Sequence, residues 1–208
     1  EKSFLKKNKN FKIFAYDHTV TKKFWLSRFK KDIVSLLLLK KLKIGKILDV
    51  FKYIDYQFFF RNNKKHFEKK IVFKAKGNEE TTIPRIINNH NKVVLKIDIE
   101  GDEYKILNDI KKNSKRIFFL LIEFHNVHKN LIKIRNFLRK SDLKIIHIHA
   151  NNYGGIDKNG IPKVIELSML NSKKIKINRI LSKRKYPIID LDYKNFKRRE
   201  DIKIEFNK

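Results

Sequence analysis

The 208-residue sequence contains no cysteine. This absence excludes a disulfide framework, a thiolate metal site and a cysteine nucleophile, and it favours a reducing, cytoplasmic location. Long apolar runs are also missing, because the longest one, residues 33–39, is interrupted by Ser35 and is far too short to cross a bilayer. Because of this short run, we expect no transmembrane segment. Residues 1–8 are mostly polar and do not resemble a secretory signal.

Basic and aromatic residues are abundant. Hydrophobic residues make up 41% of the chain and include 17 Phe, which is enough for a folded core. The formal net charge of +29 suggests a nucleic-acid partner, since clustered Lys and Arg release counterions from phosphates. The Lys residues, however, outnumber Arg and are scattered through the chain with Asn and Ile, which share A/T-rich codons. We therefore expect no specific nucleic-acid partner, only weak and salt-sensitive binding to polyanions.

Strand-like and helix-like segments alternate along the chain. Strands are predicted at residues 11–16, 71–75, 93–98, 117–122, 143–149 and 164–170, and helices at residues 21–43, 83–88, 103–110 and 131–140. Residues 47–60 mix aromatic and β-branched side chains and fit either type. The alternation predicts an α/β fold with a mostly parallel sheet and helices on both faces. We expect one domain over residues 1–170 and a basic C-terminal extension over residues 171–208, mostly irregular from residue 186.

Acidic and imidazole side chains directly follow several predicted strands. Ligands of α/β sheets bind beyond the carboxyl ends of the strands, so these side chains are candidates for a site. The candidate catalytic residues are Asp98, Glu100, Glu123, His125 and His149. Neighbouring candidates alternate with apolar residues, which points both members of a pair to the same side of a strand. Structural roles stay open, because the acids could cap a helix or pair with nearby Lys residues.

Several segments resemble those of FkbM-type methyltransferases, a class I family that uses S-adenosylmethionine. Residues 95–104 (LKIDIEGDEY) closely resemble the family's signature of lysine, aspartate, glutamate-glycine and glutamate at the fourth strand. Residues 122–125 (IEFH) resemble its fifth strand, and residues 14–17 (FAYD) resemble its second. Residues 147–152 (HIHANN), followed by residues 162–166 (PKVIE), resemble its C-terminal strands.

The resemblance covers most of residues 11–170 and implies a Rossmann-like class I methyltransferase fold. It implies methyl transfer from S-adenosylmethionine to an oxygen atom of a sugar, a glycan or a related small-molecule acceptor. Asp17 would bind the ribose hydroxyls of the donor through charge-assisted hydrogen bonds. Asp98 is the second cofactor-binding candidate.

Proton transfer from the acceptor is the other role that the resemblance implies. Asp98 and Glu100 would orient the acceptor or take its proton, and Glu123, His125 or His149 could instead be the base. A carboxylate and imidazole cluster could also hold a divalent cation that acidifies the acceptor hydroxyl, but no spacing identifies metal ligands.

One departure from the family concerns the glycine-rich turn after the first strand, where only Gly leaves room for the donor. None of the six glycines forms such a turn upstream of Asp17, and residues 1–10 are too few to hold a first strand and its loop. We therefore expect the chain to be truncated ahead of Glu1 and to bind S-adenosylmethionine poorly. The carboxylates of residues 96–103 are expected to converge with Asp17 at the rim of one sheet.

Two other functions are compatible with the sequence. The first is non-enzymatic nucleic-acid binding, which would require a basic face and a steep dependence of affinity on salt. The second is a different α/β enzyme, such as a sugar-nucleotide transferase or a metal-dependent hydrolase, in which Asp98, Glu123 and His125 hold a metal. The sequence predicts no oligomeric state.

Overall fold

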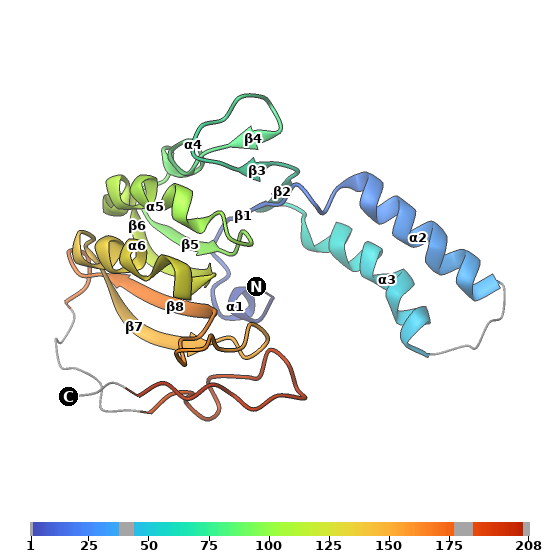
Figure 1. Cartoon of the computed structure of the whole chain (residues 1–208). Coiled ribbons are helices and arrows are strands. Elements are labelled where there is room, and N and C mark those ends of the chain that lie inside the picture. Colours follow the sequence, from blue (N-terminus) through green and yellow to red (C-terminus); the bar gives the residue numbers. More distant parts are fainter. Residues whose placement is uncertain (1, 38–43, 177–184, 206–208) are drawn as a thin grey trace. The chain divides into compact units, whose positions relative to one another are not determined.

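The chain folds into two compact units in the computed structural model, which describes residues 2–37, 44–176 and 185–205. One unit comprises Glu1–Ile71 with Ala75–Thr81, and the other comprises Val72–Lys74 with Thr82–Lys208. Figure 1 shows the elements of both units. Among the described helices, none combines the length and the hydropathy needed to cross a bilayer.

The first unit is a pair of small parallel sheets with a helical hairpin. Its elements are α1 (Lys2–Lys7), β1 (Ile13–Tyr16), α2 (Lys22–Leu37), α3 (Ile44–Phe59), β2 (Lys64–Phe67), β3 (Lys70–Ile71) and β4 (Glu80–Thr81). Strand β1 pairs with β2, and β3 pairs with β4. The predicted helix from residue 21 is confirmed as α2, while residues 38–43 lie outside the described part of the chain. The predicted strand at residues 71–75 is wrong beyond Ile71, where β3 ends.

Aromatic side chains decide the type of residues 47–60, which the sequence left open. Tyr53, Tyr56 and Phe60 recur at helical spacing, so their rings lie along one side of α3 and its end. The ring of Trp25 on α2 lies 4.9 Å from that of Tyr56 and 6.0 Å from that of Tyr53. Such ring contacts add to the burial of apolar surface and hold α2 against α3.

The second unit is built on a four-stranded sheet. Its elements are α4 (Ile83–Ile87), β5 (Val93–Ile97), α5 (Glu103–Lys112), the 3-10 helix η1 (Ser114–Arg116), β6 (Ile117–His125), α6 (Val127–Arg139), β7 (Leu143–Ala150) and β8 (Val164–Asn171). The strand order is β5-β6-β8-β7. Strand β5 runs parallel to β6, whereas β8 runs antiparallel to both β6 and β7.

A mixed α/β architecture is therefore confirmed, but the sheet of the second unit is not mostly parallel. The reason lies in the connection between β7 and β8. Residues 151–163 contain no helix that could carry the chain across the sheet, and a chain that returns directly pairs antiparallel. Helices α5 and α6 lie beside each other over one face of the sheet (Figure 1). The first unit is a separate compact unit, so the predicted covering of both faces stays a prediction.

The two faces of this sheet differ in character. Alternate residues of β6 and β8, such as Ile122 and Leu167, are buried and form the core with apolar side chains of α5 and α6. The residues between them, such as Glu123 and Glu166, are only partly buried and point to the opposite face. The strands thus place an apolar layer under the helices, while the opposite face carries polar side chains such as Glu123 and Glu166 beside apolar ones such as Leu121.

The C-terminal segment, residues 185–205, is largely irregular, as predicted. It is tied to the second unit by Asn152, whose side chain is almost fully buried. The amide nitrogen of Asn152 donates to the carbonyls of Phe196 at 3.1 Å and Arg199 at 3.0 Å, and its oxygen accepts from the backbone N–H of Phe196 at 2.8 Å. One side chain thereby satisfies three backbone groups of a segment that has little regular structure of its own.

Candidate functional site

The turn that follows β5 positions the first group of predicted residues. Strand β5 ends at Ile97, and Glu100 and Gly101 adopt left-handed backbone angles, with φ of 54° and 105°. Alternation along a strand therefore does not place Asp98 and Glu100, and that part of the prediction is wrong. Helix α5 begins after Asp102, so neither acid caps it. Both carboxylates are exposed to solvent.

The side chain of Glu103 holds this turn in place. This side chain is 0% exposed, and its Oε1 accepts hydrogen bonds from the backbone N–H groups of Gly101 at 2.9 Å and Ile99 at 3.3 Å. The residue stands in the first turn of α5, where the positive end of the helix dipole favours a carboxylate. Glu103 is thus a structural acceptor that holds the loop carrying Asp98 and Glu100.

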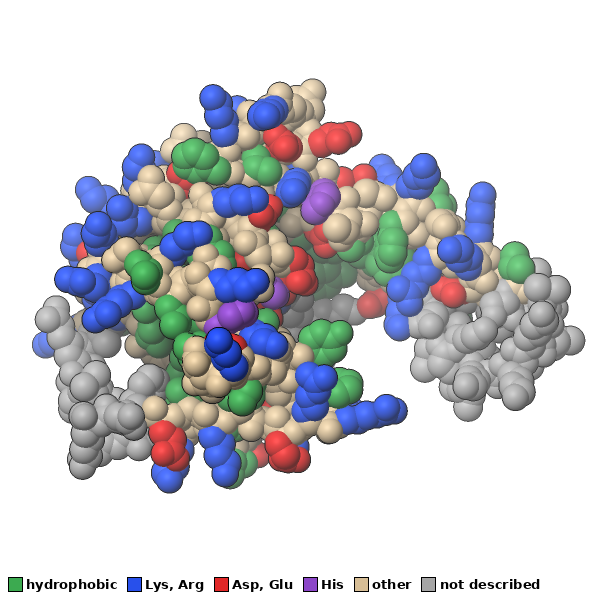
Figure 2. Space-filling model, viewed as in Figure 1, with side chains coloured by type: hydrophobic (Ala, Val, Ile, Leu, Met, Phe, Trp, Pro, Cys, Tyr) green, Lys and Arg blue, Asp and Glu red, His purple; other side chains and the backbone are tan. Residues whose placement is uncertain are grey.

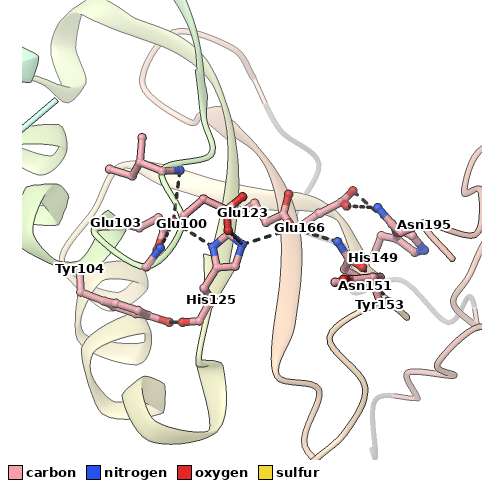
Figure 3. Close-up of polar contacts among 12 residues, drawn as sticks. Glu100, Glu103, Tyr104, Glu123, His125, His149, Asn151, Tyr153, Glu166 and Asn195 are labelled. Atoms are coloured by element: carbon pink, nitrogen blue, oxygen red, sulfur yellow. Dashed lines mark hydrogen bonds and ion pairs between the residues drawn. The ribbon is translucent and has the colours of Figure 1, made fainter. Parts of the chain in front are cut away.

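The same Oε1 atom lies 3.0 Å from Nδ1 of His125 at the end of β6 (Figure 3). A carboxylate oxygen only accepts hydrogen bonds, so Nδ1 is the donor in the contact. Nε2 of His125 then faces two carboxylates, with Oε2 of Glu100 at 3.4 Å and Oε1 of Glu123 at 3.8 Å. The turn after β5 and the end of β6 are joined through one imidazole ring.

Tyr104 supports the same strand end. Its hydroxyl donates to the carbonyl oxygen of His125 at 2.6 Å. Burial raises the pKa of Tyr104, and the neighbouring Glu103 raises it further, so the hydroxyl keeps its proton and remains a donor. The backbone of His125 is therefore fixed as well as its ring.

A row of titratable side chains crosses the sheet on its polar face. Glu123 on β6 is the register partner of Glu166 on β8, and Glu166 is the register partner of His149 on β7. Register partners point to the same face. Asp98 follows the end of β5 and lies close enough to this row for its negative charge to act on Glu123.

Glu123 occupies the middle of this row. Burial raises the pKa of Glu123, and the negative charges of Asp98 and Glu166 raise it further, while a hydrogen bond from Asn151 opposes them. The amide nitrogen of Asn151 donates to Oε1 of Glu123 at 2.9 Å. The side chain is 17% exposed, so it is enclosed but still accessible.

His149 and Glu166 form an ion pair at the other end of the row. Nδ1 of His149 lies 3.5 Å from Oε2 of Glu166, and the amide of Asn195 donates to Oε1 of Glu166 at 3.1 Å. The contact with Glu166 raises the pKa of His149, although burial lowers it in part. The pKa of Glu166 is lowered, first by the hydrogen bond with His149 and then by that from Asn195.

Asp17, the predicted donor-binding acid, lies in the first unit at the end of β1. Its Oδ1 accepts from the backbone N–H and the hydroxyl of Thr19, both at 2.7 Å, and from the N–H of Val20 at 3.3 Å. Burial raises the pKa of Asp17, but these hydrogen bonds outweigh burial and the net direction is downward. The predicted convergence of Asp17 with Asp98 stays a prediction, since the two lie in separate units.

The second unit thus brings Asp98, Glu100, Glu123 and His125 together and connects them to His149 through Glu166. One oxygen or nitrogen from each of Asp98, Glu100 and His125 lies within 4.8 Å of the others, a set of ligand atoms that could hold a metal ion.

Three residues of the cluster are not among the predicted site residues: Glu103, Asn151 and Glu166. Each stood in a segment that resembles the family. Their positions at the site depend on the antiparallel register of β8 and on the turn after β5. The sequence shows neither the register nor the turn.

Part of the chain matches a known protein family. Residues 45–145 match the methyltransferase FkbM domain. The resemblance to FkbM-type methyltransferases is thereby confirmed over this range. The matched range of the FkbM domain includes the turn after β5 and all of β6, and it therefore contains Asp98, Glu100, Glu123 and His125. No curated protein and no solved structure gave a significant match to the chain.

Proposed function

We propose that this protein transfers a methyl group from S-adenosylmethionine to a hydroxyl oxygen of a sugar or a related small molecule. The FkbM domain supports methyl transfer. The observation that carries the choice of an oxygen acceptor is the partly enclosed carboxylate of Glu123, which is surrounded by further hydrogen-bond acceptors. Each hydroxyl group has an O–H that can donate, so a set of side chains that accept hydrogen bonds suits a methyl acceptor rich in hydroxyls.

Glu123 is the proposed proton acceptor. In the reaction the hydroxyl oxygen attacks the methyl carbon, the bond from that carbon to sulfur breaks, and S-adenosylhomocysteine leaves. The proton of the hydroxyl passes to Glu123, whose other oxygen is held by Asn151 at 2.9 Å. A fixed carboxylate of limited exposure is a better-oriented base than a fully solvated one.

Asp98, Glu100 and His125 border Glu123 on the side of the turn after β5. They would accept hydrogen bonds from other hydroxyls of the acceptor and so align the reacting oxygen. The negative charge of Asp98 and Glu100 also favours a donor that carries a positive sulfonium. His149, more than nine-tenths buried and paired with Glu166, lies on the far side of Glu123 and would fix Glu166 in the row. Asp17 remains the proposed ligand of the donor ribose.

The product of the reaction tests this proposal. The protein is incubated with S-adenosylmethionine that carries a trideuterated methyl group, together with a panel of monosaccharides, nucleotide sugars and small phenols. Mass spectrometry and proton-carbon NMR then locate the label. We expect label on an acceptor oxygen and release of S-adenosylhomocysteine. Label on nitrogen or carbon, or cleavage of an acceptor without use of the donor, would contradict the proposal.

Figure 2 shows Lys and Arg side chains spread over the visible surface with Asp and Glu between them, and no single basic stripe on that face. This distribution gives the nucleic-acid alternative no specific support on the side that is shown.

A further inference from the structure

We infer that Asp98, Glu100 and His125 form a binding site for a divalent transition-metal ion such as Mn²⁺ or Zn²⁺. All three belong to the second unit, at the carboxyl ends of the adjacent strands β5 and β6. The inference concerns metal binding by the chain itself, so it can be tested without any turnover.

The spacing of the ligand atoms fits a single ion. Nε2 of His125 lies 3.4 Å from Oε2 of Glu100. Two ligands that are each about 2.1 Å from a tetrahedral metal lie roughly 3.4 Å apart, so this pair needs no rearrangement. The set of three atoms lies within 4.8 Å, and the exposed side chain of Asp98 can approach by rotation.

The buried carboxylate of Glu103 fixes the orientation of the His125 ring. It holds Nδ1 of His125 as a donor at 3.0 Å, and its own position is fixed by the N–H groups of Ile99 and Gly101. With Nδ1 held in this way, Nε2 of His125 faces the carboxylates of Glu100 at 3.4 Å and Glu123 at 3.8 Å. A histidine that ligates a metal generally donates its other ring N–H to such a carboxylate or carbonyl.

The accessibility of the ligands suggests an exchangeable ion. The side chain of Glu100 is 85% exposed and Asp98 is also exposed, whereas that of His125 is 16% exposed. Three protein ligands leave at least one coordination position for water or for a bound molecule, which is the arrangement of catalytic rather than structural sites.

The mixture of ligands limits the identity of the ion. Carboxylates suit Mg²⁺, Ca²⁺ and Mn²⁺, whereas an imidazole suits Zn²⁺ and other late transition metals. We expect Zn²⁺ to bind more tightly than Mn²⁺, and Mn²⁺ more tightly than Ca²⁺. If the proposed methyl transfer is correct, on which this step rests, the ion would bind the acceptor hydroxyl and lower its pKa beside Glu123.

Titration of the full chain with Mn²⁺ tests the site, with electron paramagnetic resonance reporting the unbound ion. We expect one Mn²⁺ per chain. Asp98→Asn, Glu100→Gln and His125→Gln should each weaken binding by more than about tenfold. Glu200→Gln is the matched control, because it removes one carboxylate charge from a side chain that is 93% exposed and pairs with Lys194. Its affinity for Mn²⁺ should equal that of the unsubstituted chain.

Displacement of the bound Mn²⁺ adds a test of the imidazole ligand. Zn²⁺ should displace Mn²⁺ at lower concentration than Ca²⁺ does. Equal displacement by Ca²⁺ would indicate an all-oxygen site and overturn the role of His125. Equal Mn²⁺ affinity in Glu100→Gln and Glu200→Gln, or no Mn²⁺ binding at all, would overturn the site. Absence of Mn²⁺ binding together with methyl transfer by the metal-free protein would leave the proposed function standing while this inference fails.

Discussion

Oε1 of Glu103 and Nδ1 of His125 lie 3.0 Å apart, which links the turn after β5 to the end of β6 through a fully buried carboxylate. Both strand ends carry residues of the candidate site. The orientation of the imidazole therefore depends on a residue of α5 that is too deeply buried to contact a substrate.

Replacing Glu103 should destabilise the second unit. In Glu103→Ala the N–H groups of Ile99 and Gly101 lose their acceptor, and an unsatisfied buried donor costs about 1–3 kcal/mol. We expect the free energy of unfolding to fall by at least that amount in urea denaturation followed by circular dichroism. Glu200→Ala, which removes an exposed carboxylate, is the control and should leave stability unchanged. Equal stability of the two variants would show that Glu103 does not hold the turn.

The left-handed turn allows backbone and side-chain effects to be separated. Gly101→Val should destabilise the protein by about 1–3 kcal/mol, because φ of 105° is unfavourable for a branched residue. Glu100→Gly should be neutral or slightly stabilising, since φ of 54° suits glycine, yet it should weaken Mn²⁺ binding as Glu100→Gln does. Thermal unfolding measures the first effect and metal titration the second. A destabilised Glu100→Gly would mean that its carboxylate supports the fold.

The ion pair of His149 with Glu166 predicts a pH dependence of stability. The raised pKa of His149 contributes stability below its unfolded value of 6.5, which is lost as the pH rises through the folded value. The lowered pKa of Glu166 contributes stability above its unfolded value of 4.5, which is lost as the pH falls through the folded value. Both contributions are present between these two values.

The unfolding free energy of the unsubstituted chain and of Glu166→Gln should therefore differ most between about pH 4.5 and 6.5. Asp192 and Asp201 also raise the pKa of His149, so part of the alkaline slope should remain in the variant. Urea denaturation across this pH range measures the difference. A difference that grows above neutral pH would be inconsistent with the pair.

Replacing Asn152 should loosen the C-terminal segment, residues 185–205. Asn152→Ala removes three hydrogen bonds to Phe196 and Arg199, each worth roughly 1 kcal/mol. We expect trypsin to cleave within residues 194–203 about tenfold faster or more in this variant, as shown by mass spectrometry of the fragments. Asn159→Ala changes an exposed residue of the same unit and should cleave at the original rate. Unchanged cleavage in Asn152→Ala would mean that the segment is held by other contacts.

Much of the fold is readable from local patterns. The continuous apolar run of residues 117–122 identifies β6, and the helical spacing of apolar residues after Gly101 identifies α5. The antiparallel direction of β8 has no such local signal, because the residues of β8 alone do not show which way it runs relative to β6 and β7. The register that sets Glu166 between Glu123 and His149 follows from that direction, so Glu166 could not be assigned to the row from the sequence.

The predicted cluster around Asp98 is present for a reason other than the one that predicted it. Asp98 and Glu100 lie near His125 because the chain turns through left-handed angles after Ile97, and not because a strand continues through them. The roles of Glu103 and Asn151 depend on burial and on contacts across strands. Such contacts arise only after the chain folds, although both residues lie in segments that resemble the FkbM family.

The most direct test of Glu123 as the proton acceptor compares two variants, Glu123→Gln and Glu200→Gln. The measured quantity is the transfer of labelled methyl from S-adenosylmethionine to a sugar hydroxyl. Glutamine keeps the shape of Glu123 and can still interact with Asn151, but it cannot take a proton. We predict a fall in kcat of about 100-fold or more in Glu123→Gln with KM little changed, and the unaltered rate in Glu200→Gln. Equal kcat values in the two variants would contradict the assignment of the reaction to this cluster.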